Sequence, residues 1–220
     1  MTPVAHVFLA LLALSLLTSP AGSMAQTIRI VALGDSTTAG TPAFKSPLES
    51  PPVGLGDETS QYAFWLMKAH PEWVVLNRGI NGQRSDEIRA RFERDVIQNR
   101  PAAIVIIAGV NDIYQGRSVE HVTGELQAMY ARAAAAALPV VAGSIIPFNT
   151  ATPEQNQRMR QVNDWIGRQP NVTFADTRAA VAASGNPDAL FESPDGLHPS
   201  AAGYRRMAEA IAPALQRVLR

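Results

Sequence analysis

The sequence predicts a three-layer α/β domain, on the strength of two observations. Short, continuously apolar runs alternate along the chain with longer helical patterns, and this alternation repeats five times. Continuously apolar strands are typical of a parallel sheet that helices cover on both faces, with right-handed crossovers between strands. In such sheets ligands bind beyond the carboxyl ends of the strands, so we expect functional residues to follow strands directly.

Five apolar runs predict the strands. The first stops at Gly34, and the clearest is an Ile- and Val-rich run that Gly109 closes. Such short runs, bounded by glycine and turn residues, are typical of buried strands. The predicted strands cover residues 28–33, 74–76, 102–108, 139–144 and 172–175.

Helical patterns lie between and after these runs. One begins at Ser85, a residue that suits the N-cap, and another at Pro153, which suits the first turn of a helix. The predicted helices cover residues 61–69, 85–98, 119–137, 153–168 and 199–219.

Residues 41–60 interrupt this alternation. The segment contains Pro42, Pro47, Pro51 and Pro52, and it therefore predicts neither helix nor strand. A loop of this length inside a compact domain is usually functional or disordered. Because it comes directly after a candidate functional serine, described below, we expect it to form a rim of the site.

The N-terminus has the layout of a cleaved signal peptide. Residues 7–17 form an apolar run that is shorter than the ~20 residues of a membrane span, and small residues precede Gln26. We predict a signal peptide over residues 1–25, a single folded domain over 26–220, and export to the periplasm or the medium without stable membrane insertion. The alternative is an N-terminal helix packed in the core.

Composition excludes several chemistries. The chain has no cysteine, which rules out disulfides, thiolate metal sites and a catalytic thiol. Its formal net charge is zero, with both signs mixed along the chain, so we expect no nucleic-acid partner. We also expect no cofactor and no metal.

Two polar motifs bracket the domain and suggest nucleophilic catalysis. Ser36, in Gly34-Asp35-Ser36, follows the first predicted strand, and His198 precedes the last predicted helix. A serine hydroxyl needs a base, and histidine is the usual one because it titrates near neutrality. Asp195 is three residues before His198, so it can accept a hydrogen bond from the imidazole. Each motif taken alone could be a turn or a helix cap.

The other two histidines of the domain, His70 and His121, are expected to be structural or solvent-exposed. The end of the second predicted strand offers Gly79, and the end of the third offers Asn111. A backbone N–H and a side-chain amide there could stabilise an oxyanion, although each residue also suits an ordinary turn.

Taken in order, Gly-Asp-Ser, a glycine after the second strand, Gly109-x-Asn111-Asp112 and Asp195-x-x-His198 resemble the SGNH, or GDSL, family of serine esterases and lipases over essentially the whole predicted domain. The resemblance implies a flavodoxin-like fold with a five-stranded parallel sheet. It also implies a triad of Ser36, Asp195 and His198, with Ser36, Gly79 and Asn111 forming the oxyanion hole.

The resulting hypothesis is an exported serine ester hydrolase that forms an acyl-enzyme on Ser36. Its substrate would be a small-molecule, lipid or carbohydrate ester, and Phe44, Phe148 and Phe191 are candidates to line an acyl pocket. The sequence favours a broad-specificity esterase similar to lysophospholipases. The alternatives are a carbohydrate O-acetyl esterase, an acyltransferase and a non-catalytic exported binding module, while the oligomeric state stays open.

Overall fold

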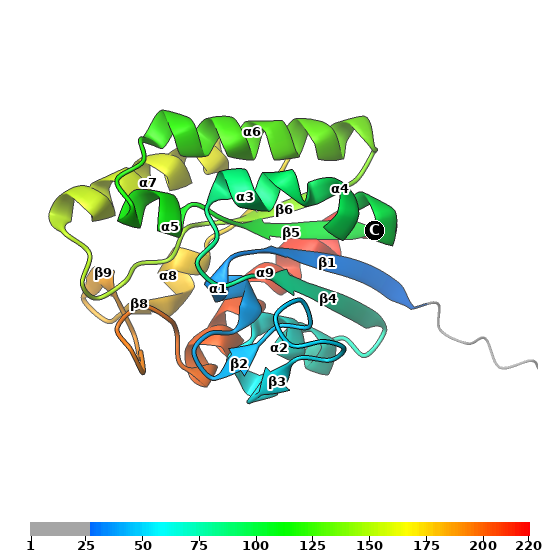
Figure 1. Cartoon of the computed structure of the whole chain (residues 1–220), viewed down its shortest axis with the longest axis horizontal. Coiled ribbons are helices and arrows are strands. Elements are labelled where there is room, and N and C mark those ends of the chain that lie inside the picture. Colours follow the sequence, from blue (N-terminus) through cyan, green and yellow to red (C-terminus); the bar gives the residue numbers. More distant parts are fainter. Residues whose placement is uncertain (1–26) are drawn as a thin grey trace, which may run out of the picture.

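A computed structural model describes residues 27–220, so the predicted signal peptide lies outside the described residues. Five parallel strands form the central sheet in the order β4-β1-β5-β6-β7 (Figure 1). They are β1 (Ile28–Gly34), β4 (Trp73–Gly79), β5 (Ala103–Ile107), β6 (Val140–Gly143) and β7 (Thr173–Ala175). With the strands numbered among themselves this order is 2-1-3-4-5, the flavodoxin-like order, which confirms the predicted architecture.

Helices cover both faces of the sheet, because alternate strand residues point to opposite sides. Val31 and Leu33 of β1 pack in a core with one helix layer, whereas Ile30 and Ala32 pack with the other. The first layer contains α3 (Ser85–Ala90), α4 (Phe92–Asp95), α6 (Val119–Ala135) and α7 (Pro153–Gly167). The second contains α2 (Tyr62–Ala69), α8 (Thr177–Val181) and α9 (Ala201–Val218).

Two short helices and two small hairpins are also present. The helices are α1 (Ser36–Ala39) and α5 (Val110–Tyr114), and each directly follows a central strand. The hairpins pair β2 (Phe44–Lys45) with β3 (Leu55–Gly56), and β8 (Ala182–Ala183) with β9 (Asn186–Leu190). Within residues 27–220, none of the helices combines the length and hydropathy needed to cross a bilayer.

The strand register places three loops at one edge of the sheet. Gly34, the last residue of β1, pairs with Gly79 at the end of β4 and with Ile107 at the end of β5. These three strands therefore end level with one another. The residues that follow them, including Ser36 and Asn111, consequently emerge at the same edge.

The predicted helix over residues 85–98 is interrupted at Arg91. It divides into α3, α4 and a short 3₁₀ turn, η2 (Ile97–Asn99). The buried Arg91 guanidinium donates to the carbonyl oxygens of Gly34 and Arg78 and pairs with Asp95 at 2.9 Å. The break thus lies at a residue that is tied to the ends of two strands.

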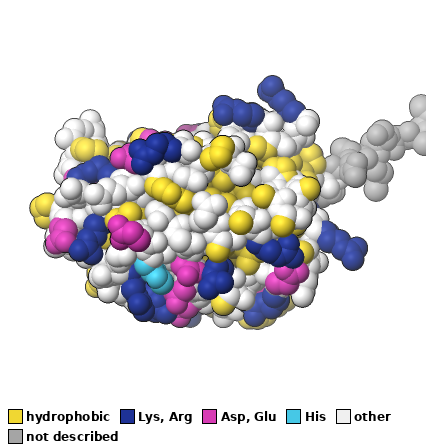
Figure 2. Space-filling view, turned by 90° about the horizontal axis from the view of Figure 1, so that it is seen from above, with side chains coloured by type: hydrophobic (Ala, Val, Ile, Leu, Met, Phe, Trp, Pro, Cys, Tyr) yellow, Lys and Arg dark blue, Asp and Glu magenta, His cyan; other side chains and the backbone are white. Residues whose placement is uncertain are grey.

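Charged side chains of both signs are intermingled on the face that includes α6, with apolar side chains between them (Figure 2). This distribution matches the zero formal net charge of the chain. On the face shown, neither sign forms a continuous field that would attract a polyanion over a long range.

Candidate active site

Ser36 sits on a tight turn between β1 and α1. The Oδ1 atom of Asp35 accepts the backbone N–H of Thr37 at 2.9 Å and so caps α1. Gly34 leaves no room for a side chain, since a Cβ there would lie 2.4 Å from the carbonyl oxygen of Ile107. Ser36 is the first residue of α1. The backbone N–H at this position has no acceptor within the helix and can therefore donate a hydrogen bond to a negatively charged group.

The structure brings Ser36, His198 and Asp195 into one hydrogen-bonded chain. His198 Nε2 lies 2.9 Å from Ser36 Oγ, and His198 Nδ1 lies 2.7 Å from Asp195 Oδ2. The two motifs are separated by 162 residues in sequence, yet both lie at the carboxyl edge of the sheet. A serine hydroxyl, an imidazole and a carboxylate are therefore in direct contact, in the arrangement that a nucleophile, its base and an orienting carboxylate require.

The loop of Asp195 and His198 is held by its own hydrogen bonds. Asp195 Oδ1 accepts the backbone N–H groups of Leu197 and His198, and the hydroxyl of Ser193 donates to the carbonyl oxygen of His198 at 2.7 Å. Partial burial by itself would raise the pKa of Asp195, but the hydrogen bonds from the His198 ring and from the two backbone N–H groups outweigh it and lower the pKa. Asp195 is thus kept as an anion beside the imidazole.

Asn111 enters the site from the first turn of α5. Gly109, which precedes that helix, has φ 119°, a left-handed conformation that favours glycine. The Nδ2 group of Asn111 donates one hydrogen bond to the carbonyl oxygen of Gln83 at 2.9 Å, which fixes the side chain. An amide NH₂ has two donors, so the second remains for the cavity that Asn111 lines.

Gly79 does not occupy the predicted position. Its backbone N–H donates to Asn77 Oδ1 at 2.9 Å, and its carbonyl oxygen accepts the hydroxyl of Ser46 at 2.6 Å. A Cβ at this residue would lie 2.1 Å from the backbone nitrogen of Ala39. The prediction that Gly79 donates to the oxyanion hole is therefore wrong, because Gly79 is a packing residue whose N–H is already bonded.

Gly82, in the loop directly after β4, has different properties. It follows Asn81, which lines the cavity, and its φ of 76° is in the left-handed region. A Cβ there would meet no atom within 4 Å, so Gly82 is required by backbone conformation rather than by packing. Gly82 is three residues after Gly79 in Gly79-Ile80-Asn81-Gly82. The sequence alone could not show which of the two glycines adopts a positive φ.

A small cavity of about 160 Å³ opens beside the triad. Phe148, as expected, forms part of its wall, whereas Phe44 and Phe191 do not. Phe44 instead lines a separate hollow beneath the β2–β3 hairpin, and Phe191 lies under the guanidinium of Arg206. The full lining is Ser36, Thr37, Asn81, Val110, Asn111, Tyr114, Phe148, Leu197 and His198.

The Pro-rich segment 41–60 contributes no residue to this cavity, so it is not the rim that the sequence led us to expect. The segment instead forms hydrogen bonds with the end of β4 and the loop after it. Besides the bond from Ser46 to Gly79, Glu49 Oε1 accepts the backbone N–H of Asn81 at 2.9 Å. The segment therefore contacts the loop after β4, and the backbone N–H of Thr41 also donates to the carbonyl oxygen of Ser36 at 3.2 Å.

Asp35 carries a fully buried carboxyl group next to the nucleophile. Its Oδ1 atom caps α1, but its Oδ2 atom has no hydrogen-bond partner in the described part of the chain. Burial is the main cause that raises the pKa of Asp35 to about 7, and the hydrogen bonds from Thr37 only partly oppose it.

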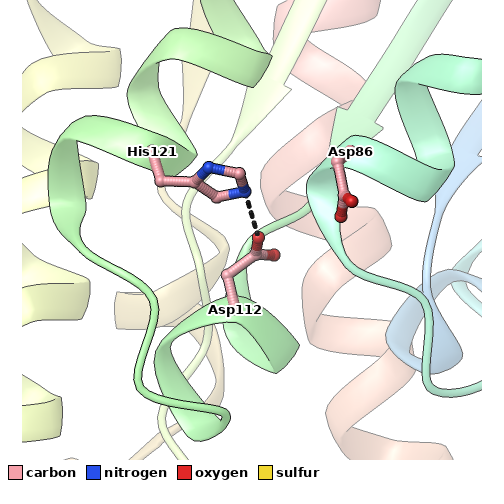
Figure 3. A group of neighbouring side chains, drawn as sticks. All are labelled: Asp86, Asp112 and His121. Atoms are coloured by element: carbon pink, nitrogen blue, oxygen red, sulfur yellow. Dashed lines mark ion pairs between the residues drawn. The ribbon is translucent and has the colours of Figure 1, made fainter.

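Asp86, Asp112 and His121 form the group of side chains in Figure 3, with one ligand atom each within 4.8 Å of the others. His121 Nε2 lies 3.7 Å from Asp112 Oδ1. Both oxygens of the buried Asp112 accept hydrogen bonds from Ser85, and the Asp86 carboxylate is bound by Arg84. The carboxylate oxygens of Asp86 and Asp112 are thus already bound within the protein, whereas His121 Nε2 is buried without a hydrogen-bond partner among residues 27–220. The bonds from Ser85 to Asp112 anchor α5 to α3.

His70 is half-buried beside α9, where its Nε2 atom lies 3.4 Å from Gln216 Nε2. Its ring stacks on Trp73 at 3.9 Å, and its Nδ1 atom pairs with Glu72 at 3.4 Å. The placement of His70 and His121 agrees with the structural roles expected for both.

The fold and the contact of Ser36, His198 and Asp195 are those of an α/β serine hydrolase. The chain matches the model of the GDSL-like Lipase/Acylhydrolase family over residues 32–206. It belongs to this family, which confirms the resemblance, and it is a carboxylic ester hydrolase.

One curated relative and two solved structures illustrate the match. The acetylxylan esterase of Geobacillus stearothermophilus is 33% identical, with 71% of this chain and 80% of the relative covered. A putative lipolytic protein of the G-D-S-L family from Desulfitobacterium hafniense superposes with a TM-score of 0.69 at 22% identity, covering 86% of this chain and 99% of that one. A catalytic mutant of the acetylxylan esterase Axe2 from G. stearothermophilus gives a TM-score of 0.66 at 21% identity, covering 86% and 94%. The two structures support the fold.

Proposed function

We propose that this chain hydrolyses short acyl esters through an acyl-enzyme on Ser36, and that acetyl esters of carbohydrates are its preferred substrates. The observation that carries the proposal is the hydrogen-bonded chain from Asp195 through His198 to Ser36, which opens onto a cavity of about 160 Å³.

In the first half of the reaction, Ser36 Oγ attacks the ester carbonyl carbon while His198 Nε2 accepts the hydroxyl proton. Asp195 accepts the hydrogen bond from Nδ1–H and stabilises the imidazolium that forms. His198 then gives the proton to the leaving alcohol oxygen as the bond between carbonyl carbon and alkoxy oxygen breaks. Water repeats these steps on the acyl-enzyme and releases the acid.

The negative charge on the carbonyl oxygen needs fixed donors. The Ser36 N–H at the start of α1 and the second amide hydrogen of Asn111 are two of them. We assign the third to the backbone N–H of Gly82, in place of Gly79. Its support is the left-handed turn after Asn81 and the absence, within residues 27–220, of a protein acceptor for that N–H.

The size of the cavity favours a short acyl group. Its volume is below the ~300–1,000 Å³ of pockets that enclose drug-sized ligands, and close to the ~150 Å³ of a cavity that holds benzene. An acetyl group fits this space, whereas a fatty acyl chain extends out of it. We therefore favour a carbohydrate O-acetyl esterase over the lysophospholipase-like activity that the sequence led us to expect.

The relatives support the same choice. The curated relative at 33% identity is an acetylxylan esterase, and two structures of Axe2 are described as catalytic mutants in which a serine and a histidine are replaced by alanine. We also propose export by cleavage of residues 1–25, which rests on the apolar run and the small residues before Gln26. N-terminal sequencing of the secreted protein tests this, and an intact Met1 on it would contradict cleavage.

The activity is tested with p-nitrophenyl esters from acetate to laurate, followed by acetylated xylo-oligosaccharides. We expect acetate to be cleaved fastest, and no hydrolysis by Ser36→Ala. Ser118→Ala, which removes an exposed N-cap hydroxyl from α6, serves as the matched control and should retain activity. Faster cleavage of laurate than of acetate would contradict the short-acyl proposal. Product analysis with added alcohol distinguishes hydrolysis from acyl transfer.

A further inference from the structure

Two large apolar side chains remain exposed at the mouth of the active-site cavity. Tyr114 is 59% exposed and Leu197 is 39% exposed, and both line the cavity. Adjacent exposed apolar side chains beside an active-site cavity are informative, because exposed apolar patches mark sites where ligands or partners bind. The acyl-transfer chemistry described above uses neither of these side chains.

Tyr114 is held in a defined position with respect to the oxyanion hole. It is the last residue of α5, three residues after Asn111, so the two side chains lie on the same face of the helix with their Cβ atoms ~5–6 Å apart. The ring of Tyr114 also packs edge-on against Phe148, with centroids 5.9 Å apart and an interplanar angle of 69°. Phe148 is buried, so it gives the exposed ring a fixed support.

Either the acyl group or the alcohol group of the ester can contact the Tyr114 ring, and the size of each group decides which one does. If the acyl group is acetyl, as the proposed function has it, the acid side ends inside the cavity. Only the alcohol side of the ester then has atoms that extend past Asn111 to the mouth. A sugar ring suits that position, because its C–H faces pack on an aromatic face while its hydroxyl groups stay in water.

We propose that Tyr114 is a specificity-determining residue, the platform on which the sugar ring that carries the ester lies. The inference rests on the proposed function and makes it more specific. It assigns the exposed ring to recognition of the carbohydrate alcohol and leaves the chemistry to the residues already described.

The test compares two acetyl esters whose alcohols differ in size. Acetylated xylo-oligosaccharide presents sugar rings to the mouth, and ethyl acetate, followed by titration of the released acid, presents none. In Tyr114→Ala we expect kcat/KM for the sugar ester to fall roughly tenfold through KM, the size typical of a truncated aromatic anchor. Ethyl acetate should change by less than about twofold, because the oxyanion donors are intact.

Two further variants sharpen the comparison. Tyr114→Phe keeps the ring and should retain most of the activity on the sugar ester. Phe174→Ala removes an exposed aromatic ring from β7, outside the active-site cavity, and should leave both substrates unaffected.

Three outcomes would overturn the inference. If Tyr114→Ala lowers kcat for both esters equally, the residue supports the site rather than the alcohol. If it weakens only esters with longer acyl chains, such as ethyl hexanoate, the ring faces the acid side. If the wild-type protein cleaves ethyl acetate but not the sugar ester, the carbohydrate substrate class of the proposed function is wrong and the inference fails with it.

Discussion

Replacing Asp35 by asparagine should change how the stability of the fold depends on pH. An aspartate carboxyl ordinarily ionises near pH 3.8, whereas burial raises the pKa of Asp35 to about 7. Between these values the folded chain binds more protons than the unfolded chain, so the free energy of unfolding falls as the pH rises. A shift of about 3 pH units corresponds to about 4 kcal/mol at ~1.36 kcal/mol per unit. This contribution is fully present below pH 4 and lost by pH 7.

Asp35→Asn removes the titrating group but keeps an oxygen that can accept the Thr37 N–H. We therefore expect the variant to gain up to about 4 kcal/mol relative to the wild-type protein between pH 4 and pH 7. Urea denaturation at half-unit pH steps measures the difference. Asp57→Asn is the control, because Asp57 caps the η1 turn (Glu58–Ser60) by the same bond to residue i+2 but is exposed. Parallel stability curves for wild type and Asp35→Asn would show that Asp35 does not titrate in this range.

Three further predictions concern the site. Asn111→Ala should lower kcat by ~10²- to 10³-fold in steady-state ester hydrolysis, the loss expected for one oxyanion donor, and normal turnover would exclude the assignment. Asp195→Asn should lower kcat by up to ~10⁴-fold because the wrong imidazole tautomer is favoured, and a change confined to KM would contradict its role beside His198. Gly79→Ala should lower the thermal midpoint of unfolding, because its Cβ would overlap the backbone at Ala39, and an unchanged midpoint would contradict the packing role.

Most of the fold could be predicted from the hydrophobic pattern of the sequence. The five strands and the two helix layers follow from continuous apolar runs, because only a sheet covered on both faces buries Ile30 and Val31 on opposite sides. The pattern failed within residues 85–98. The break at Arg91 is held by tertiary hydrogen bonds to Gly34 and Arg78, which helical periodicity does not contain.

The contact of Ser36 with His198 was predictable, because the two residues belong to motifs in the expected order and at the expected places beside strands and helices. The choice between Gly79 and Gly82 was not. The choice depends on which backbone N–H donates to the Asn77 side chain and on which glycine has a positive φ. Both are settled only when β4 packs beside α1.

The segment 41–60 shows the same limit. Its prolines predicted an irregular loop, but a loop that follows Ser36 in sequence can either line the cavity or contact the loops that line it. The hydrogen bonds from Ser46 to Gly79 and from Asn81 to Glu49 show the second arrangement. The size of the cavity, which favours a short acyl group, is likewise a property of how its lining residues pack rather than of any motif.

The role of Ser36 as nucleophile is best examined by covalent labelling with a fluorophosphonate probe, followed by peptide mapping by mass spectrometry. We expect a single labelled peptide that contains Ser36, loss of label in Ser36→Ala, and much slower labelling in His198→Ala, because the base is missing. Label on a different serine, or undiminished ester hydrolysis by Ser36→Ala, would contradict it.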